Sequence, residues 1–466
     1  MASEPAHAAP YDEERPRDGR FRARYTDLLA ALRAAGVTTL AAAVRRHLEQ
    51  AGVTFSGEPF AVDPVPRLIA ASEWEALEAG LAQRARALNA FLRDAYGERR
   101  VVAAGLIEPS LIDDAEGYEP DLAGRLSGVR APAAIIGFDL VREPGGEFLV
   151  VEDNLRTPSG LAYLLAARAA LAPTLPPELP QPRPVDPVLY DLLRDTLHAA
   201  APAAARADGH MPQAVLATDS PDNTAYYEHA HLAAALEIPL VTPDDLMVEG
   251  DRLFVELPDG SVRRVDVVYR RTDEDRVRDD DGHMTTIARL LLAPWLAGEV
   301  GLVNAFGNGV ADDKLVHGNV EDFVRFYLEE EPLVRSVPTL SLPAALGEDP
   351  VASLRRLVVK PRHGHGGRGV TIGTTAELDE LARLARELRA QPEDYVAQPI
   401  VPLSRHPTVI DGRLEPRHVD LRPFAFCAGE EVRLAPGGLS RVAFAAGEMV
   451  VNSSQNGGGK DTWVLD

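Results

Sequence analysis

Cysteine is almost absent from this chain of 466 residues, and its single thiol, Cys427, excludes an intramolecular disulfide framework. Basic residues are also in deficit, with 48 Lys and Arg against 71 Asp and Glu and a formal net charge of -23. Nucleic-acid binders show a basic face, so this acidic balance excludes nucleic acid as an expected partner. Long apolar runs are missing as well. The most apolar stretch, residues 160–173, is too short to span a bilayer and contains Arg168.

Residues 1–20 are polar and rich in proline, without the apolar run of a secretory signal, so we expect none. We expect this stretch to be a disordered tail, and the protein to be cytoplasmic without a membrane partner. The composition that remains, 45% apolar and 26% charged, is typical of a folded protein. Its length predicts two to four structural units.

The hydrophobic pattern changes several times along the chain. Helical periodicity predicts a helical N-terminal region over residues 21–130. Residues 131–171 contain two short apolar runs separated by EPGG and then a helix, which predicts a β-hairpin followed by a helix. Seven prolines in residues 172–187 indicate an extended connector. Strands alternate with helices over residues 188–310, and residues 311–466 become rich in strands after position 350. The whole predicts an α/β (α+β) fold.

A glycine-rich loop, KPRHGHGGRGV, occupies residues 360–370. Gly364, Gly366 and Gly369 satisfy G-x-G-x-x-G, but a strand follows, whereas a dinucleotide fingerprint requires a helix there. A glycine-rich loop between antiparallel strands, with Lys360 at the end of the first, can fold over nucleotide phosphates as a flap. A glycine-rich turn without a ligand is the alternative.

A second glycine-rich segment, NGGGKD at residues 456–461, contains Lys460 but lacks the spacing of a phosphate-binding loop. An exposed C-terminal tail explains it equally well.

The predicted hairpin carries polar side chains at the end of its strands. Glu152 and Asn154 are two residues apart and therefore share a face, and strand pairing would bring Asp139 opposite them. Three oxygen ligands of this kind suit Mg²⁺ completed by nucleotide phosphates. The alternative is solvated acidic residues near a turn, although burying Asp139 unpaired within an apolar strand would cost several kcal/mol.

At these two loops the sequence resembles a known family. E-x-N followed by P-x-G, with an aspartate one hairpin strand earlier, resembles the metal-binding hairpin of ATP-grasp enzymes. K-P-x-x-G-x-G-G-x-G-V resembles their phosphate flap. The flap usually comes first, so the chain resembles the circularly permuted ATP-grasp group related to glutathionylspermidine synthetases. The resemblance runs from about residue 90 to the end and implies a circularly permuted ATP-grasp fold.

The resemblance implies roles for individual residues. The implied metal ligands are Asp139, Glu152 and Asn154. The implied nucleotide-binding residues are Lys314, Lys360, Gly364, Gly366, Gly367 and Gly369, with Gln398 and the backbone of Ile400 at the adenine. The implied basic residues near the transferred phosphoryl group are Arg422 and, as anion-binding neighbours, Arg156, Arg441 and Lys460. One position departs from the family, because Gly137 stands where an arginine is often found. Either another basic residue acts there, or the acyl-phosphate oxygen is less well held.

The function implied is that of an ATP-dependent carboxylate–amine ligase that forms an amide through an acyl phosphate. ATP and Mg²⁺, or Mn²⁺ in its place, are the implied cofactors. The implied partners are a small-molecule or peptide carboxylate and an amine acceptor, and a homo-oligomer is compatible with the sequence. The alternatives are a small-molecule kinase and a non-catalytic nucleotide-binding scaffold.

Other chemistries have weaker support. Cys427 lies in an apolar run and is interpreted as a small buried side chain rather than a nucleophile. The H-x-H pairs at residues 229–231 and 363–365 lack the further ligands of a zinc site. Arg270 and Arg271 end a predicted strand, where they could hold a substrate carboxylate or simply be surface charges.

Overall fold

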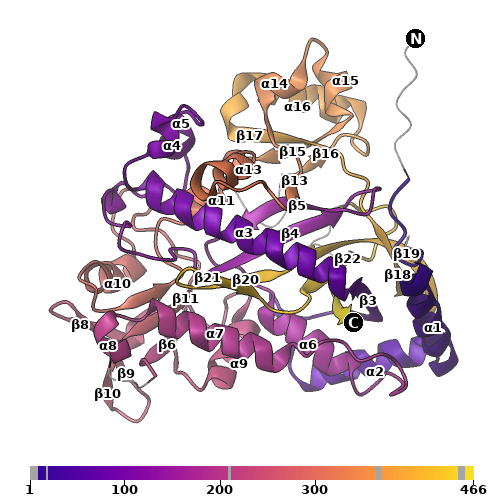
Figure 1. Cartoon of the computed structure of the whole chain (residues 1–466), viewed down its shortest axis with the longest axis horizontal. Helices are drawn as coiled ribbons and strands as arrows, with labels where there is room; N and C mark the ends of the chain where they lie inside the picture. The colour runs from indigo at the N-terminus through magenta and orange to yellow at the C-terminus, as the bar shows by residue number, and fades with distance from the viewer. Residues whose placement is uncertain (1–8, 17–18, 208–210, 364–368, 450–456) are drawn as a thin grey trace.

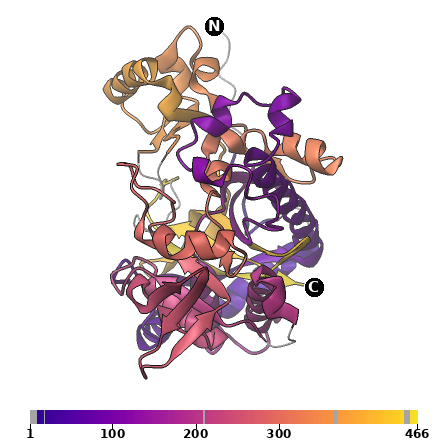
Figure 2. The same cartoon turned by 90° about the vertical axis from the view of Figure 1, so that its left-hand side faces the viewer.

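The computed structural model describes residues 9–16, 19–207, 211–363, 369–449 and 457–466. It shows an α/β protein with several sheets, as predicted, and Figures 1 and 2 show how these are arranged. The glycines of the expected flap at 364, 366 and 367 lie outside the described residues.

A ten-stranded sheet forms the centre of the molecule. Its main path runs β13-β5-β4-β19-β22-β23-β3, and β18, β20 and β21 pair onto it. The bounds are β3 (Val62–Ala70), β4 (Ile135–Arg142), β5 (Phe148–Asn154), β13 (Arg335–Ser336), β18 (Arg405–Ile410), β19 (Arg413–Arg422), β20 (Phe424–Ala428), β21 (Glu431–Leu434), β22 (Leu439–Ala443) and β23 (Gly457–Leu465). The predicted hairpin is confirmed as β4 and β5. Because β23 pairs in parallel with β3, one sheet joins the two ends of the chain (Figure 1).

The N-terminal region is mostly helical but not entirely. Its helices are α1 (Gly19–Ala35), α2 (Val37–Gln50), α3 (Ala71–Ala95), α4 (Arg100–Ala103) and α5 (Ser110–Asp113). The expectation of helices alone is wrong at β3 and at the small hairpin of β1 (Thr54–Phe55) and β2 (Glu58–Pro59). Pro64 and Pro66 disfavour a helix interior, and an edge strand such as β3 tolerates their missing N–H groups.

A smaller four-stranded sheet, ordered β14-β17-β15-β16, lies at the top of Figure 1 with three helices. The bounds are β14 (Leu340–Ser341), β15 (Leu357–Pro361), β16 (Thr371–Ile372), β17 (Tyr395–Pro399), α14 (Leu342–Leu346), α15 (Pro350–Leu354) and α16 (Leu378–Ala390). It has a core of its own, which includes Leu342, Val359, Leu381 and Leu388. The antiparallel strands expected on either side of the flap are confirmed as β15 and β16.

The α/β alternation expected over residues 188–310 is confirmed by a parallel sheet ordered β12-β11-β6-β7. The bounds here are α6 (Leu161–Leu171), α7 (Asp186–Ala200), α8 (Ala203–Ala207), β6 (Ala214–Thr218), α9 (Tyr226–Leu236), β7 (Leu240–Val241), β11 (Val267–Arg271), α10 (Thr286–Leu296) and β12 (Gly301–Val303). A three-stranded sheet of β8 (Leu246–Glu249), β9 (Arg252–Glu256) and β10 (Val262–Val265) is inserted before β11. The strand order changes direction between β6 and β11, and ligands of such sheets bind at the carboxyl ends of the strands near that point.

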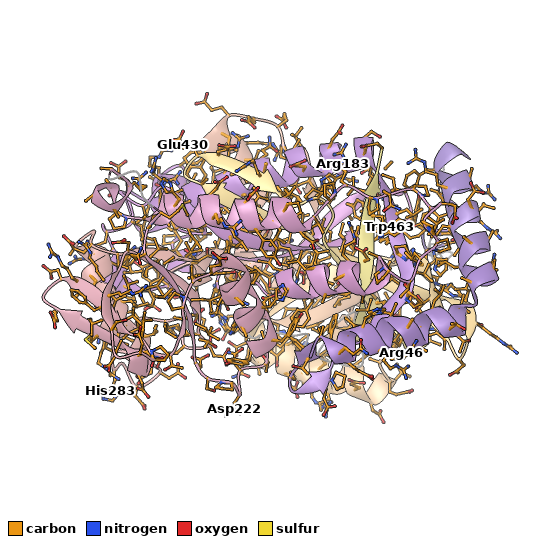
Figure 3. The ribbon with its side chains drawn as sticks, turned by 90° about the horizontal axis from the view of Figure 1, so that it is seen from below. Arg46, Arg183, Asp222, His283, Glu430 and Trp463 are labelled. Carbon is orange, nitrogen blue, oxygen red and sulfur yellow. The ribbon has the colours of Figure 1, made fainter. Side chains whose placement is uncertain are left out.

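The expected connector and part of the expected N-terminal tail both form hydrogen bonds with the folded protein. Residues 172–185 contain neither helix nor strand, and the N–H of Arg183 donates to Val464 O at 3.0 Å, near the labelled Trp463 in Figure 3. Part of the expected N-terminal tail is also packed, because Glu13 is buried and accepts hydrogen bonds from Arg67 and Arg142. Residues 9–16 are therefore not a free tail.

Within the described ranges, no single helix is long and apolar enough to cross a membrane. Among the helices that the structure describes, one pair, α1 and α2 taken together, reaches the required length and composition, and the two are bent by 84°.

Candidate active site

The β4–β5 hairpin brings the three expected metal ligands onto one face. Asp139 pairs directly with Glu152, and Gly137 pairs with Asn154. Directly opposed residues of an antiparallel pair point to the same side, so the oxygen atoms of Asp139, Glu152 and Asn154 converge. The amide nitrogen of Asn154 donates to Gly137 O at 3.3 Å, which orients the side chain.

The residue between Glu152 and Asn154 faces the other way and has a structural role. Asp153 is buried, and Arg84 donates to both of its oxygens at 2.6 and 2.7 Å. His317 Nδ1 lies 2.7 Å from the same carboxylate. The charge of Arg84 holds the pKa of Asp153 below its usual range despite the burial. Glu152 and Asn154 therefore face the expected site, whereas Asp153 between them forms buried contacts in the core.

Two arginines from distant strands hold Asp139. Arg422, at the end of β19, donates to Asp139 Oδ1 and Oδ2 at 2.6 and 2.8 Å. Arg441, on β22, lies with Nη2 2.9 Å from Asp139 Oδ2 and also pairs with the buried Asp420. Their positive charges hold the pKa of Asp139 well below its ordinary value, against the opposing effect of burial. Both arginines therefore contact the expected metal ligand Asp139, and their placement near a transferred phosphoryl group stays a prediction.

Position 137 is tightly packed, so a side chain there, such as the arginine often found in the family, would require its neighbours to shift. A Cβ on Gly137 would lie 3.0 Å from Pro158 Cβ and 3.4 Å from the ring of Phe424. Phe424 is also the direct strand partner of Gly137. Arg422, two residues before Phe424, supplies a guanidinium to the same aspartate from the neighbouring strand.

Two of the three lysines in the chain lie close to the carboxylates of the hairpin. Lys314 begins α12 (Lys314–His317), and its Nζ lies 3.7 Å from Glu152 Oε1 and donates to Arg362 O at 3.3 Å. Lys360 lies on β15, on the face opposite the core residue Val359. Burial and the nearby Lys314 ammonium lower the pKa of Lys360, whereas the carboxylates of Glu152 and Asp139 raise it. The lysines and the acidic pair therefore form one electrostatic cluster.

The third lysine lies elsewhere, contrary to the expectation that it neighbours the bound anion. Lys460 is buried on β23, where its ammonium pairs with Asp63 and donates to Pro407 O at 3.1 Å. The alternative of an exposed tail is also wrong for residues 457–465, because they form a buried strand. Lys460 is an internal ion-pair partner that ties β23 to β3.

The expected adenine hinge falls on β17. Gln398 is buried, and its amide donates to Thr339 Oγ1 at 2.9 Å and to Val151 O at 3.3 Å. The N–H of Ile400 donates to Arg356 O at 3.1 Å, so it is already engaged. Gln398 therefore links the small sheet to β5, and base contact by these two residues stays a prediction. Of the flap glycines, Gly369 alone is described, with a φ of 72° that suits glycine.

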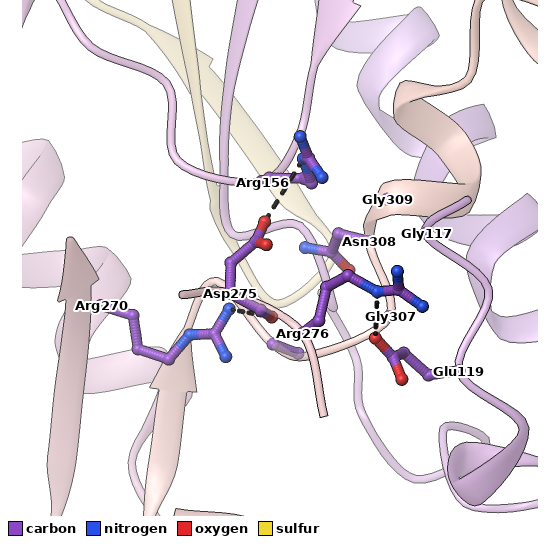
Figure 4. A pocket seen from close by; sticks show the side chains of 10 residues that line it. Gly117, Glu119, Arg156, Arg270, Asp275, Arg276, Gly307, Asn308 and Gly309 are labelled. Carbon is purple, nitrogen blue, oxygen red and sulfur yellow. Dashed lines mark hydrogen bonds and ion pairs between the residues drawn. The ribbon is translucent and has the colours of Figure 1, made fainter. Parts of the chain in front are cut away.

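A pocket opens beside the end of the hairpin (Figure 4). Arg156 lines it and pairs with Asp275 at 3.3 Å and with Asp312 at 3.4 Å. Asp312 ends α11 (Gly309–Asp312) and accepts a hydrogen bond from the N–H of Leu155, which directly follows Asn154. Burial raises the pKa of Asp312 to about 7. Arg156 thus connects the hairpin to the carboxyl ends of the parallel sheet.

Sequence reasoning missed Glu228 and Asp312. Glu228 is fully buried on α9, accepts from Gly160 N at 2.8 Å and Ala162 N at 3.0 Å at the start of α6, and pairs with Arg271. A glutamate within an apolar helix was the available signal, because a buried carboxylate needs a partner. Asp312 had no comparable signal, since VADDK reads as an ordinary polar turn.

The three hairpin ligands fit Mg²⁺, but only as part of a larger set. All three offer oxygen, the atom that this cation prefers. In the parts of the chain that the structure describes, no three His, Cys, Asp or Glu side chains gather as a metal site. A divalent cation here therefore needs further oxygens, and Lys314 and Lys360 lie where nucleotide phosphates would supply them.

The acidic hairpin, the facing lysines and the two sheets that carry them define the ATP-grasp class. Residues 66–443 match the family described as circularly permuted ATP-grasp type 2. The chain belongs to this family, which confirms the resemblance and the fold inferred from the sequence.

Relatives share most of the chain. A Frankia alni protein named "Putative glutamate--cysteine ligase 2-3" is 42% identical over 98% of this chain and 54% of its own length. An uncharacterised protein of Synechocystis is 41% identical over 87% of this chain and 84% of its own. An uncharacterised protein of Mycobacterium tuberculosis is 39% identical over 98% and 84%. The chain thus spans about half the length of the Frankia relative.

Proposed function

We propose that the protein joins a carboxylate to an amine at the expense of ATP. The carboxylate attacks the γ-phosphate and forms an acyl phosphate with release of ADP, and the amine then displaces inorganic phosphate to form an amide. The observation that carries the proposal is the placement of Asp139 directly across from Glu152, with Lys314 3.7 Å from Glu152. This combination of acidic pair and cations suits phosphoryl transfer, in which positioning and charge neutralisation do the chemistry.

Each residue has a defined task in this proposal. Asp139, Glu152 and Asn154 would hold Mg²⁺, which when bound neutralises the charge of the β- and γ-phosphates. Lys314 and Lys360 would bind the phosphate oxygens from the opposite side. Arg422 and Arg441 would hold Asp139 in place and offer guanidinium charge to the transferred group.

Arg156 is proposed as a positioning residue. Its pairs with Asp275 and Asp312 fix the segment that follows Asn154, so that the hairpin end keeps its orientation. Gln398 and the backbone near Ile400 are proposed to meet the adenine, with the N–H of Ile400 excluded as a donor because Arg356 O accepts it.

A hydroxylamine trap tests the proposal. The protein, Mg·ATP and a panel of carboxylic acids are incubated with hydroxylamine, which converts an acyl phosphate to a hydroxamate. We expect one acid to give both ADP release and hydroxamate, with Mg²⁺ required and Mn²⁺ able to replace it. ADP release without hydroxamate would instead indicate a kinase acting on a hydroxyl group, and ATP binding without any turnover would indicate a scaffold.

Glutamate and cysteine are the first members of the panel, because the Frankia relative carries the name of a glutamate–cysteine ligase. The chain corresponds to only about half of that relative, so amino acids, short peptides and polyamines complete the panel.

A further inference from the structure

Two arginines end β11, and the structure gives them different surroundings. Arg270 and Arg271 are both buried at the carboxyl end of a parallel strand, next to the change of direction in strand order. Successive residues of a strand point to opposite faces, so their side chains serve different sides of the sheet. The surface-charge interpretation of this pair is therefore wrong.

Arg271 holds the fold through both of its terminal nitrogens, and only its Nε is without an acceptor among the described residues. It donates to Glu228 at 2.9 Å, to Pro158 O at 2.7 Å and to Ser159 Oγ at 2.5 Å. These contacts connect β11 to α9 and to the loop that follows the hairpin. Its charge is neutralised by Glu228, which leaves no role for it toward a ligand.

Arg270 forms no ion pair among the described residues, although the carboxylates of Asp275 and Glu119 act on its charge and raise its pKa against the effect of burial. Its side chain is 2% exposed, and its guanidinium lies over the ring of Phe306 at 4.0 Å from the centroid. Among the described residues, Nε and Nη1 have no hydrogen-bond acceptor, and Nη2 has only a long contact of 3.4 Å to Asp275 O. Burial lowers the pKa of Arg270 to about 10, so it remains charged at neutral pH.

The unpaired donors of Arg270 line the pocket beside the hairpin, as Figure 4 shows. The acidic side chains of the same pocket are already engaged. Asp275 pairs with Arg156, and Glu119 lies 3.3 Å from Arg276 Nε. Buried guanidinium donors without an acceptor are costly, so these donors of Arg270 are available to a ligand that can accept hydrogen bonds from them.

We propose that this pocket receives a carboxylate group of the substrate and that Arg270 is the residue that binds it. This inference rests on the proposed ligase function and names the element that selects its acid. The phosphates of ATP are taken by Lys314 and Lys360, so the anion left for Arg270 is a carboxylate. Phe306 keeps the guanidinium plane fixed, and Arg156 places the pocket next to Asn154. The acid is thereby held between the parallel sheet and the phosphoryl-transfer site.

Direct binding tests this assignment without turnover. Calorimetry on the nucleotide-free protein compares glutarate and succinate with the neutral diamide of glutarate and with inorganic phosphate. The variants are Arg270→Gln, which removes the charge, and Arg270→Lys, which keeps the charge but loses the planar donors. Arg278→Gln is the matched control, because Arg278 is exposed on the segment after β11 and pairs with Asp121.

We expect the dicarboxylates to bind at millimolar or lower concentration and the diamide not to bind. Arg270→Gln should weaken dicarboxylate binding by about tenfold or more, the loss typical of a charge-assisted contact. Arg270→Lys should show a smaller loss, and Arg278→Gln should match the wild type. With the acid identified, its KM should rise in Arg270→Gln while the KM for ATP stays unchanged.

Three results would overturn the assignment: no dicarboxylate binding to the wild type, unchanged binding in a folded Arg270→Gln, or phosphate binding that depends on Arg270 and excludes the dicarboxylates. If Arg270→Gln does not fold, unchanged binding in Arg270→Lys overturns it instead.

ATP affinity measured on the same samples separates the two proposals. Intact ATP binding with no carboxylate binding rejects only the pocket, and carboxylate binding through Arg270 without hydroxamate formation rejects only the ligase chemistry.

Discussion

Arg422 grips Asp139 with two hydrogen bonds, from Nε at 2.6 Å and from Nη2 at 2.8 Å, across 283 positions of sequence. The contact forms because β4 and β19 are neighbours in the ten-stranded sheet. It places a fixed positive charge beside the acidic hairpin at the position where Gly137 leaves none.

Replacing Arg422 tests whether this charge serves catalysis. Arg422→Met should lower turnover by at least about a hundredfold, the loss expected when a fixed group that stabilises transition-state charge is removed. Nucleotide affinity should fall much less, because Lys314 and Lys360 are retained. Arg413→Met, an exposed change on the same strand, is the control for steady-state turnover. Normal turnover in Arg422→Met would remove the arginine from the proposed site.

Glu152 and Asp153 are adjacent, and their substitutions should have opposite effects. Glu152→Gln removes a negative charge from the expected cation site, so turnover should fall by about a hundredfold or more while stability is retained. Raising Mg²⁺ or supplying Mn²⁺ should restore part of the activity. Near-normal ADP release by Glu152→Gln at limiting Mg²⁺ would refute the metal role.

Asp153→Asn should instead destabilise the protein, because it leaves Arg84 buried without its carboxylate. We expect a loss of about 3–5 kcal/mol in the free energy of unfolding, measured with denaturant. The folded pKa of Asp153 is depressed. Its stabilisation is therefore complete above the unfolded pKa of about 3.9 and is lost as the pH falls below it. The variant should lack this part of the acid-induced loss of stability, and equal acid sensitivity would contradict the assignment.

Substitutions of Lys360 and Lys460 should likewise differ, the first in ATP affinity and the second in stability. Lys360→Met should weaken ATP binding roughly ten- to hundredfold, because it removes a charge-assisted contact to phosphate, and should leave the fold intact. Lys460→Met should preserve ATP affinity in the folded fraction but destabilise the protein, since Asp63 loses its buried partner. Calorimetry with ATP and thermal unfolding distinguish the two. Unchanged ATP affinity in Lys360→Met would reject the predicted flap.

Cys427 should behave as a packing residue. Its thiol is buried on β20, where burial raises its pKa to about 12, and the amide nitrogen of Asn89 lies 3.7 Å from Sγ. Cys427→Ala should retain most activity at a modest cost in stability, and thiol reagents should react slowly with the native protein. Rapid alkylation accompanied by complete loss of turnover would show that it is a nucleophile.

The local sequence pattern was sufficient to predict those parts of the candidate site that lie on a single hairpin or beside a single loop. The spacing of Glu152 and Asn154 and the EPGG turn predicted their shared face, because strand periodicity is a local property. The two apolar runs around the flap predicted β15 and β16 in the same way. The prolines of β3 could be seen in the sequence. However, this strand pairs with β23, almost 400 residues later, and no local sequence pattern predicts that pairing.

The sequence by itself determined which chemistry the chain carries: an acidic hairpin, a lysine before a glycine-rich loop and the alternation of an α/β sheet. Tertiary structure alone decided which charges meet. It paired Arg422 and Arg441 with Asp139, enclosed Lys460 with Asp63, and paired Arg271 with Glu228 while Arg270 forms no ion pair among the described residues. The physical reason is that the free energy of a charge depends on its burial and its neighbours, and both are set by strands that meet only when the chain is folded.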